Sequence, residues 1–334
     1  MQMNKDLHDV LKFDMDKEVE SIGQRLREIL RTNLKRRGLV VAISGGIDSS
    51  VTAALCVKAL GPKKVFGLLL PERDSVSLST SRGRMLAEHL KIEYLEVNIA
   101  STLKEIGCYT WRDDAIKTVF PDYGDGWKNK IAIEGGRDGK INHFQLIVQS
   151  PNGESFTERL PLKEYLQIVA ATNFKQRIRK TLEYFHADRL HFAVVATPNR
   201  LEYDQGFFVK NGDGAGDIKP IAHLYKTQVY ALARHLHLPQ EICEAEPTTD
   251  TYSMPQSQDE FYFALPLEKM DLALWAYNKS LPAADLATLI NISESQAVFI
   301  YKDIENKRRT TAMLHWSPIL IKQVSGLIPK PDAD

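Results

Sequence analysis

Short apolar runs and amphipathic segments alternate along the first hundred residues of the chain. The apolar runs lie at 39–43, 64–70 and 92–97, and the segments with helical periodicity lie at 19–34, 49–60 and 78–90. Strands that alternate with helices are joined by right-handed crossovers, so they form a parallel sheet that is buried on both faces. The sequence therefore predicts an α/β fold with a doubly wound parallel sheet.

This alternation stops after residue 100. The strand-like runs 141–149 and 155–160, with a turn between them, predict a β-hairpin inserted at about 108–160. The pattern then resumes, and the further predicted elements are a strand at 192–195 and helices at 163–185, 227–237, 267–279, 283–289 and 294–306. We expect a single domain over 1–334, with a helical C-terminal segment at about 251–334.

Composition argues against several classes of protein. The 334 residues include 43 Lys and Arg and 43 Asp and Glu, so the net charge is zero and no broad basic field attracts a nucleic acid. No apolar run approaches the ~18 residues of a membrane span, and the first twelve residues lack the apolar core of a secretory signal. Cys56, Cys108 and Cys243 lie far apart, which disfavours a disulfide framework or a thiolate zinc site. We expect a cytoplasmic protein that binds neither membrane nor nucleic acid.

The turn after the first predicted strand has the composition of a phosphate-binding loop. It reads Ser44-Gly-Gly-Ile-Asp-Ser-Ser50 and lies where a parallel strand ends, which is where α/β folds bind ligands. Glycines allow a tight turn with exposed amides, and the following helix N-terminus favours an anion. Asp48 would repel phosphate unless a cation lay between them, so the loop also indicates Mg²⁺. It lacks the lysine of a Walker loop.

This loop resembles the pyrophosphate loop of the N-type ATP pyrophosphatases, which adenylate a substrate and release pyrophosphate. The second half of the chain resembles one family among them, the NAD synthetases. The segments that carry this resemblance, in order, are 173–177, 196–202, 206–210, 212–217, Pro220, 224–228 and 246–250. The resemblance covers roughly 39–99 and 172–250, and it implies ATP-dependent amidation of deamido-NAD by ammonia through an adenylated carboxylate.

The resemblance also implies roles for individual residues. ATP would be bound by Ala42, Ile43, Ser44, Gly45, Gly46, Ile47, Asp48, Ser49, Thr197, Lys226 and Thr248. Asp48 and Lys226 would be catalytic, and Asp48 and Glu202 would hold Mg²⁺. The deamido-NAD site would include Asn173, Arg177, Lys210, Asp213, Asp217, Asn306 and Lys307. The family is also homodimeric, so a homodimer is implied.

Two departures from the family concern the site for deamido-NAD, the substrate that would accept the adenylyl group. NAD synthetases carry a His-Lys pair where this chain has Asn306-Lys307, and the stretch 101–173 is longer than in the family. Two alternatives therefore stay open: the same chemistry on a different carboxylate, or a non-catalytic nucleotide-binding subunit. Residue 2 is Gln rather than a nucleophilic Cys, and no glutaminase domain is present, so the nitrogen would come from free ammonia or from a separate glutaminase.

Overall fold

The computed structural model describes residues 9–134, 143–245, 252–254, 265–322, 324 and 326. Four parallel strands form the main sheet, in the order β3 (Glu93–Glu96), β2 (Val65–Leu69), β1 (Leu39–Ala42) and β7 (Ala193–Val195). This confirms the predicted parallel sheet. Between described residues a bridge from Val195 to Ile218 extends the pairing beyond β7.

Helices cover both faces of this sheet. Leu39 and Val41 of β1 pack into a core shared with α2 (Met15–Ile29), α3 (Ile47–Leu60) and α9 (Lys226–His235). Val40, between them, points to the opposite face, because successive side chains of a strand alternate. The core on that face includes α5 (Ala100–Ile106), the start of α6 (Cys108–Val119) and α7 (Leu162–Leu190). The sheet is therefore doubly wound, as predicted.

The N-terminal amphipathic helix forms as predicted and covers α3. Its N-cap residue, Asp14, accepts a hydrogen bond of 3.0 Å from the Lys17 amide. Val19, Ile22 and Leu26 lie on its buried face. The helix continues through a π-helical turn, Leu30–Leu34, before β1 begins.

The insertion is larger than the predicted hairpin. Strands β5 (His143–Gln149) and β6 (Ser155–Arg159) form that hairpin, and β4 (Lys128–Glu134) pairs antiparallel with the other edge of β5. Strand β4 is not predicted by the sequence pattern, because its buried face carries a polar residue, Asn129, which is fully buried beside Ile131. Helices α5 and α6, which precede this sheet, were also not predicted.

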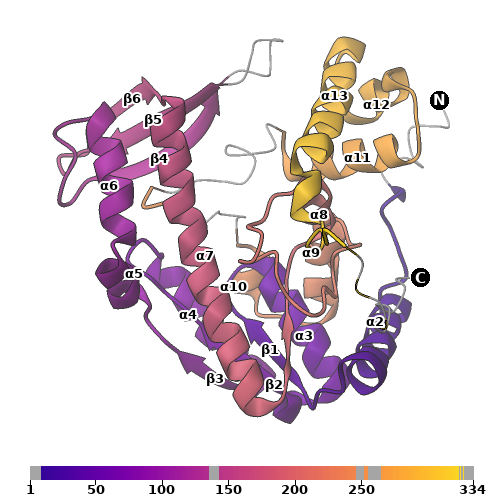
Figure 1. The fold of residues 1–334 in the computed structure, drawn as a ribbon. Helices are drawn as coiled ribbons and strands as arrows, with labels where there is room; N and C mark the ends of the chain where they lie inside the picture. Colours follow the sequence, from indigo (N-terminus) through magenta and orange to yellow (C-terminus); the bar gives the residue numbers. More distant parts are fainter. Residues whose placement is uncertain are drawn as a thin grey trace.

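The longest helix, α7, joins the insertion to the main sheet. Its 29 residues span about 43 Å. Ile168 near its start packs in the core of the inserted sheet, whereas Ala187 near its end packs against the parallel sheet. Figure 1 shows this helix running past both sheets.

The C-terminal helices agree with the sequence analysis. They are α11 (Leu267–Asn278), α12 (Ala283–Ile290) and α13 (Glu294–Thr311), and they lie over α8 and α9 (Figure 1). The remaining helices are α4 (Ser77–Leu90), α8 (Arg200–Gln205) and α10 (Gln240–Cys243), with 3₁₀ turns at Pro62–Lys64 and Ala312–Leu314. In the described part of the chain, none of the helices is both long and apolar enough to cross a membrane.

Candidate active site

The glycine-rich loop lies between β1 and the first turn of α3. Gly45 has φ of +82°, and a Cβ there would lie 2.2 Å from the Ser79 carbonyl oxygen, so only glycine fits. Gly46 is the N-cap residue of α3 and has no side chain with which to cap it. The Ser44 and Ser49 hydroxyls lie 3.1 Å apart beside these amides. The loop therefore presents hydroxyls and helix N-terminal amides in one place, which is the arrangement that binds an anion.

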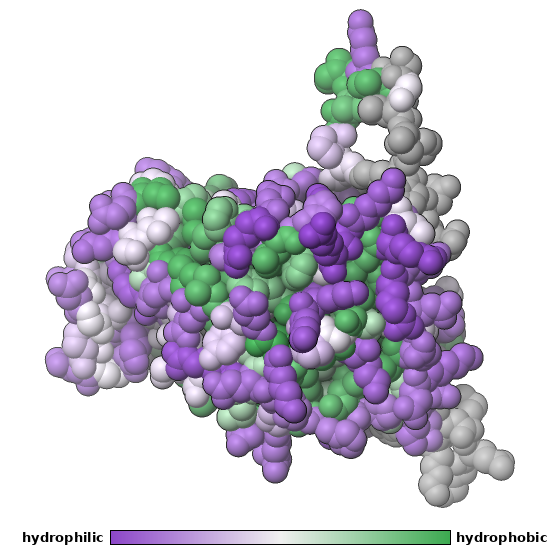
Figure 2. Space-filling view, turned by 90° about the horizontal axis from the view of Figure 1, so that it is seen from below, coloured by the Kyte–Doolittle hydropathy of each residue, from purple (hydrophilic) through white to green (hydrophobic). Residues whose placement is uncertain are grey.

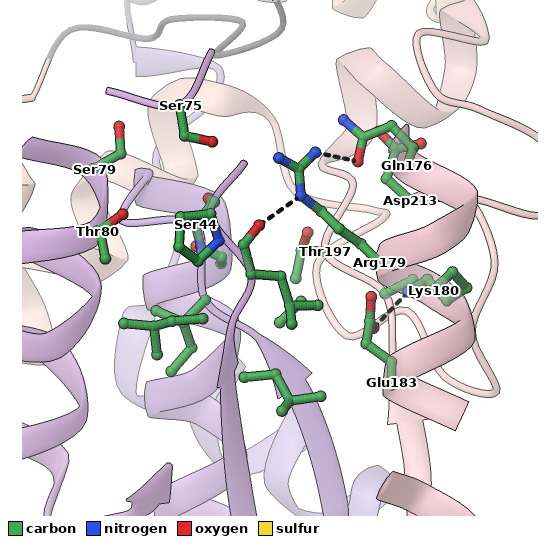
Figure 3. Close-up of a pocket in the computed structure, with 18 of the residues that line it drawn as sticks. Ser44, Ser75, Ser79, Thr80, Gln176, Arg179, Lys180, Glu183, Thr197 and Asp213 are labelled. Atoms are coloured by element: carbon green, nitrogen blue, oxygen red, sulfur yellow. Dashed lines mark hydrogen bonds and ion pairs between the residues drawn. The ribbon is translucent and has the colours of Figure 1, made fainter. Parts of the chain in front are cut away.

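A pocket opens at the carboxyl ends of β1, β2 and β7. Ala42, Ile43, Ser44, Ser49 and Thr197, all predicted to bind ATP, line it. Figure 3 shows Ser75, Ser79 and Thr80 on one side of the pocket and Gln176 and Arg179 of α7 on the other.

Arg179 ties this wall to the main sheet. Its Nε donates a 3.0 Å hydrogen bond to the carbonyl of Leu70, directly after β2. The long helix α7 and the end of the central strand β2 are thus held together at the pocket.

Lys226 and Asp48 form a buried ion pair at the loop. Lys226 is the first residue of α9, its side chain is 3% exposed, and its ammonium donates to Asp48 Oδ2. Burial acts to lower the pKa of Lys226, but the carboxylates of Asp48 and Glu202 outweigh it and raise the pKa above its ordinary value. The lysine therefore stays charged near neutral pH. The structure brings these three predicted residues together although they are far apart in sequence.

Glu202 reaches this cluster from the first turn of α8. The N-cap residue of α8 is Asn199, whose side chain accepts hydrogen bonds from the amides of Leu201 and Glu202. Asn199 also donates to Asp48 Oδ1 at 3.0 Å. Asn199 was not among the predicted site residues, although an Asn three residues before a Glu is the signature of a capping box.

The cluster suits a divalent cation that arrives with a nucleotide. Among the described residues, no group of three or more His, Cys, Asp or Glu side chains could hold a metal ion by itself. Two carboxylates are the usual protein share of a Mg²⁺ site in which phosphates and waters supply the other ligands. Asp48 and Glu202 fit that share, since both are near Lys226 and both contact Asn199.

Arg177 and Lys210, both predicted to bind deamido-NAD, lie together. Arg177 Nε donates to the Lys210 carbonyl at 3.2 Å. The Lys210 ammonium donates to the carbonyls of Met313, at 2.7 Å, and Trp316, at 3.2 Å. The C-terminal turn is therefore held next to this predicted substrate surface.

Asp213 and Asp217 shape the glycine-rich segment that connects α8 to α9. Asp213 lines the pocket and accepts a 2.7 Å hydrogen bond from the Val209 amide. Asp217 accepts a 2.8 Å hydrogen bond from the Val194 amide, which ties the segment to β7.

The other residues predicted to bind deamido-NAD are spread over two helices. Asn173 lies one turn before Arg177 on α7. Asn306 and Lys307 lie on α13, where Asn306 accepts from Arg309 and Lys307 pairs with Asp303 at 2.7 Å. Thr248 lies outside the described residues.

A buried charged network that the sequence analysis missed supports one wall of the pocket. Lys175 of α7 contacts Glu72 at 3.0 Å and Asp74 at 2.6 Å, and Arg112 of α6 contacts Asp74 at 2.5 Å. Burial acts to raise the pKa of Asp74, but Lys175 and Arg112 outweigh it and lower the pKa to about 2. The turn that carries both acids also carries Ser75, which lines the pocket, so the network fixes that wall against α7.

Comparison with known proteins gives one consistent family. The family model described as NAD synthase matches residues 18–118 and 144–311. The chain is 52% identical over 320 residues to the "NH(3)-dependent NAD(+) synthetase" of Rhizobium meliloti (strain 1021), which covers 96% of each chain. Since so little of either chain is left unaligned, the insertion is shared with that relative.

Two solved structures have a similar fold. The NMN synthetase from Francisella tularensis has a TM-score of 0.62 at 20% identity, with 92% of this chain and 100% of that chain covered. The NH3-dependent NAD synthetase from Campylobacter jejuni subsp. jejuni NCTC 11168 has a TM-score of 0.60 at 23% identity, with 93% and 100% covered.

Proposed function

This chain belongs to the NAD synthase family, and we propose that it amidates deamido-NAD with ammonia at the expense of ATP, giving NAD, AMP and pyrophosphate. The observation that carries the proposal is that Ser44 and Ser49 of the glycine-rich loop line the pocket, while Asp48 of the same loop pairs with the buried Lys226. These groups supply amides, hydroxyls and a buried cation where a triphosphate would lie. Because the proposed reaction joins nitrogen to carbon with ATP as the energy source, the protein would be a ligase that forms C–N bonds.

The reaction has two steps in this proposal. The nicotinate carboxylate attacks the α-phosphorus of ATP, the bond to the β-phosphate oxygen breaks, and pyrophosphate leaves. Ammonia then adds to the adenylated carboxyl carbon, AMP leaves with the bonding electrons, and the nitrogen loses a proton as the amide forms. Adenylation is needed because a free carboxylate is a poor electrophile.

The protein's part in these steps is alignment and charge neutralisation. The amides of the loop and the Lys226 ammonium would stabilise the charge that develops on the leaving pyrophosphate. A Mg²⁺ ion held by Asp48 and Glu202 would supply further charge neutralisation on the phosphates. Thr197 and Thr248 would complete the ATP site.

The acceptor would bind along α7 and the segment between α8 and α9. Arg177 and Lys210 suit a ligand with a pyrophosphate and a carboxylate. Asn173, Asp213, Asp217, Asn306 and Lys307 belong to the same proposal. Ammonia would enter either from solution or from a separate glutaminase.

We further propose a cytoplasmic homodimer. Cys56, Cys108 and Cys243 are free thiols in the described structure, which suits a reducing compartment. Apolar side chains gather across the middle of the face shown in Figure 2. A homodimer would cover part of this area, and light scattering of the purified protein should give twice the monomer mass.

The product analysis tests the reaction directly. Purified protein with ATP, Mg²⁺ and ammonia should form AMP, pyrophosphate and NAD when deamido-NAD is added, and should release little pyrophosphate without it. Formation of ADP and orthophosphate, or pyrophosphate release that ignores deamido-NAD, would contradict the proposal.

A substitution tests the role of the buried lysine. Lys226→Met should lower kcat by roughly 100-fold or more, because the charge on the leaving group loses a preorganised cation. Lys63→Met is the control, since Lys63 is exposed and lies just before β2, at the opposite end of the parallel strands from the pocket. Equal kcat values for the two variants would remove Lys226 from the mechanism.

A further inference from the structure

Asn199 contacts both proposed metal-binding carboxylates. It lies in the turn after β7 and is 1% exposed. Its Nδ2 donates to Asp48 Oδ1 at 3.0 Å, and its backbone amide donates to Glu202 Oε2 at 3.1 Å. Asp48 lies on α3 and Glu202 on α8, so one residue joins acids from two helices.

The orientation of the Asn199 amide is fixed by its partners. Its Oδ1 accepts from the amides of Leu201 and Glu202, at 2.9 Å and 3.1 Å. If the amide were flipped, its NH₂ would face two N–H groups and its oxygen would face a carboxylate, so neither side could form hydrogen bonds. The Nδ2 group therefore always points at Asp48.

This arrangement leaves Asp48 with a defined geometry. Its two oxygens have different donors, Asn199 on Oδ1 and Lys226 on Oδ2. A neutral amide holds the carboxylate in place without cancelling its charge, whereas a second lysine would neutralise it. Two acids and one lysine leave a net negative charge in the cluster, which attracts a divalent cation.

We infer that Asn199 is a positioning residue that sets the relative placement of the Asp48 and Glu202 carboxylates for the divalent cation that accompanies ATP. This inference rests on the proposed function. It assigns Asn199 two separable tasks, because the side-chain oxygen caps α8 while the side-chain nitrogen orients Asp48.

Substitutions can separate these tasks. Serine and threonine are good N-cap residues but are too short to place a donor on Asp48, so Asn199→Ser and Asn199→Thr should keep the cap and lose the contact. Asn199→Ala should lose both. Ser293→Ala is the matched control, since Ser293 caps α13 through a capping box of the same kind, away from the pocket.

The main measurement is Mn²⁺ binding, followed by electron paramagnetic resonance in the presence of ATP and without deamido-NAD, so that no turnover is required. We expect Asn199→Ser and Asn199→Thr to melt close to the wild-type temperature and to bind Mn²⁺ roughly tenfold more weakly, as for the loss of one hydrogen bond to a charged group. Ser293→Ala should lower the melting temperature and leave Mn²⁺ binding unchanged.

The possible failures are distinguishable. If the wild-type protein with ATP binds no more Mn²⁺ than ATP alone, the proposed metal site itself is wrong. If the wild type binds Mn²⁺ and both cap-competent variants bind it within twofold of the same affinity, the inference about Asn199 is overturned. The same holds if Ser293→Ala weakens Mn²⁺ binding as much as they do.

Discussion

At the scale of single residues, the helix that begins with Lys226 is capped by a carboxylate from another helix. Asp271 of α11 is fully buried and accepts a 2.8 Å hydrogen bond from the Thr227 amide, directly after Lys226 in the first turn of α9. The helix N-terminus favours a negative charge at this place. Burial nevertheless raises the pKa of Asp271 to about 6, because its hydrogen bonds with the first turn of α9 and the charge of Lys226 do not offset the lost hydration.

This raised pKa predicts how stability changes with pH. The folded protein holds the Asp271 proton more tightly than the unfolded chain, so the contribution is complete below about pH 4 and is lost as the pH rises to about 6. The free energy of unfolding should fall by up to about 3 kcal/mol over this range on account of Asp271. Asp271→Asn keeps an acceptor for Thr227 and should remove this fall.

Urea unfolding of both proteins between pH 4 and pH 7.5 measures the difference. The two free-energy curves should converge toward low pH and separate toward neutral pH, with the variant the more stable there. Asp74 does not interfere, because its pKa is lowered and its contribution is lost only below about pH 4. Curves that stay parallel would show that Asp271 does not titrate in this range.

At the scale of elements, the inserted sheet is tied to a distant part of the chain. The backbone amide of Asn129 in β4 donates to Ser253 Oγ at 2.8 Å, and the Met254 amide donates to the Asn129 carbonyl at 3.2 Å. Tyr252 packs in the core of the inserted sheet. The edge of β4 thus holds residues 252–254, which follow α10.

A double-mutant cycle can measure the side-chain part of the contact between Asn129 and Ser253. The Asn129 side chain also donates to Ser253 Oγ, at 3.3 Å, and to the Tyr123 hydroxyl, at 2.7 Å. Ser253→Ala should cost about 1 kcal/mol and Asn129→Ala about 2–3 kcal/mol in the free energy of unfolding, with a coupling energy of at least 0.5 kcal/mol. Tyr123→Phe with Ser253→Ala is the control cycle, and it should give a smaller coupling. Strictly additive effects of Asn129→Ala and Ser253→Ala would mean that the hydrogen bond between these two side chains contributes nothing.

The same elements show what could be predicted from the sequence. The strands of the main sheet and the glycine loop were predictable, because apolar runs and a pair of glycines after a strand can be recognised from neighbouring residues alone. Strand β4 was not, because Asn129 is buried by partners that lie over a hundred residues away. The contact between Lys175 and the acids at 72 and 74 was hidden for the same reason. The role of Lys226 could be proposed only from the family resemblance, because its ion-pair partner, Asp48, is distant in sequence.

At the scale of the whole molecule, α7 joins the two sheets, because its residues pack in the cores of both. Ile168 is fully buried in the core of the inserted sheet, and Ala171, one turn later, is already in the core of the parallel sheet. The charged network of Lys175 lies on the same helix. Because the two cores share one continuous helix, we expect them to unfold together rather than as separate units.

Ile168→Ala tests this coupling. The substitution leaves a cavity in the inserted core and should cost about 2–5 kcal/mol. Leu166→Ala is the matched control on the same helix, since Leu166 is 55% exposed, and it should change stability by less than about 0.5 kcal/mol. Unfolding would be followed in single-tryptophan variants through Trp127 of the insertion and Trp111 of α6, whose ring contacts Phe174 beside the core of the parallel sheet. If the cores are coupled, Ile168→Ala shifts both midpoints equally. A shift at Trp127 alone would show that the insertion unfolds as an independent unit, because the cavity would then weaken only the core that contains it.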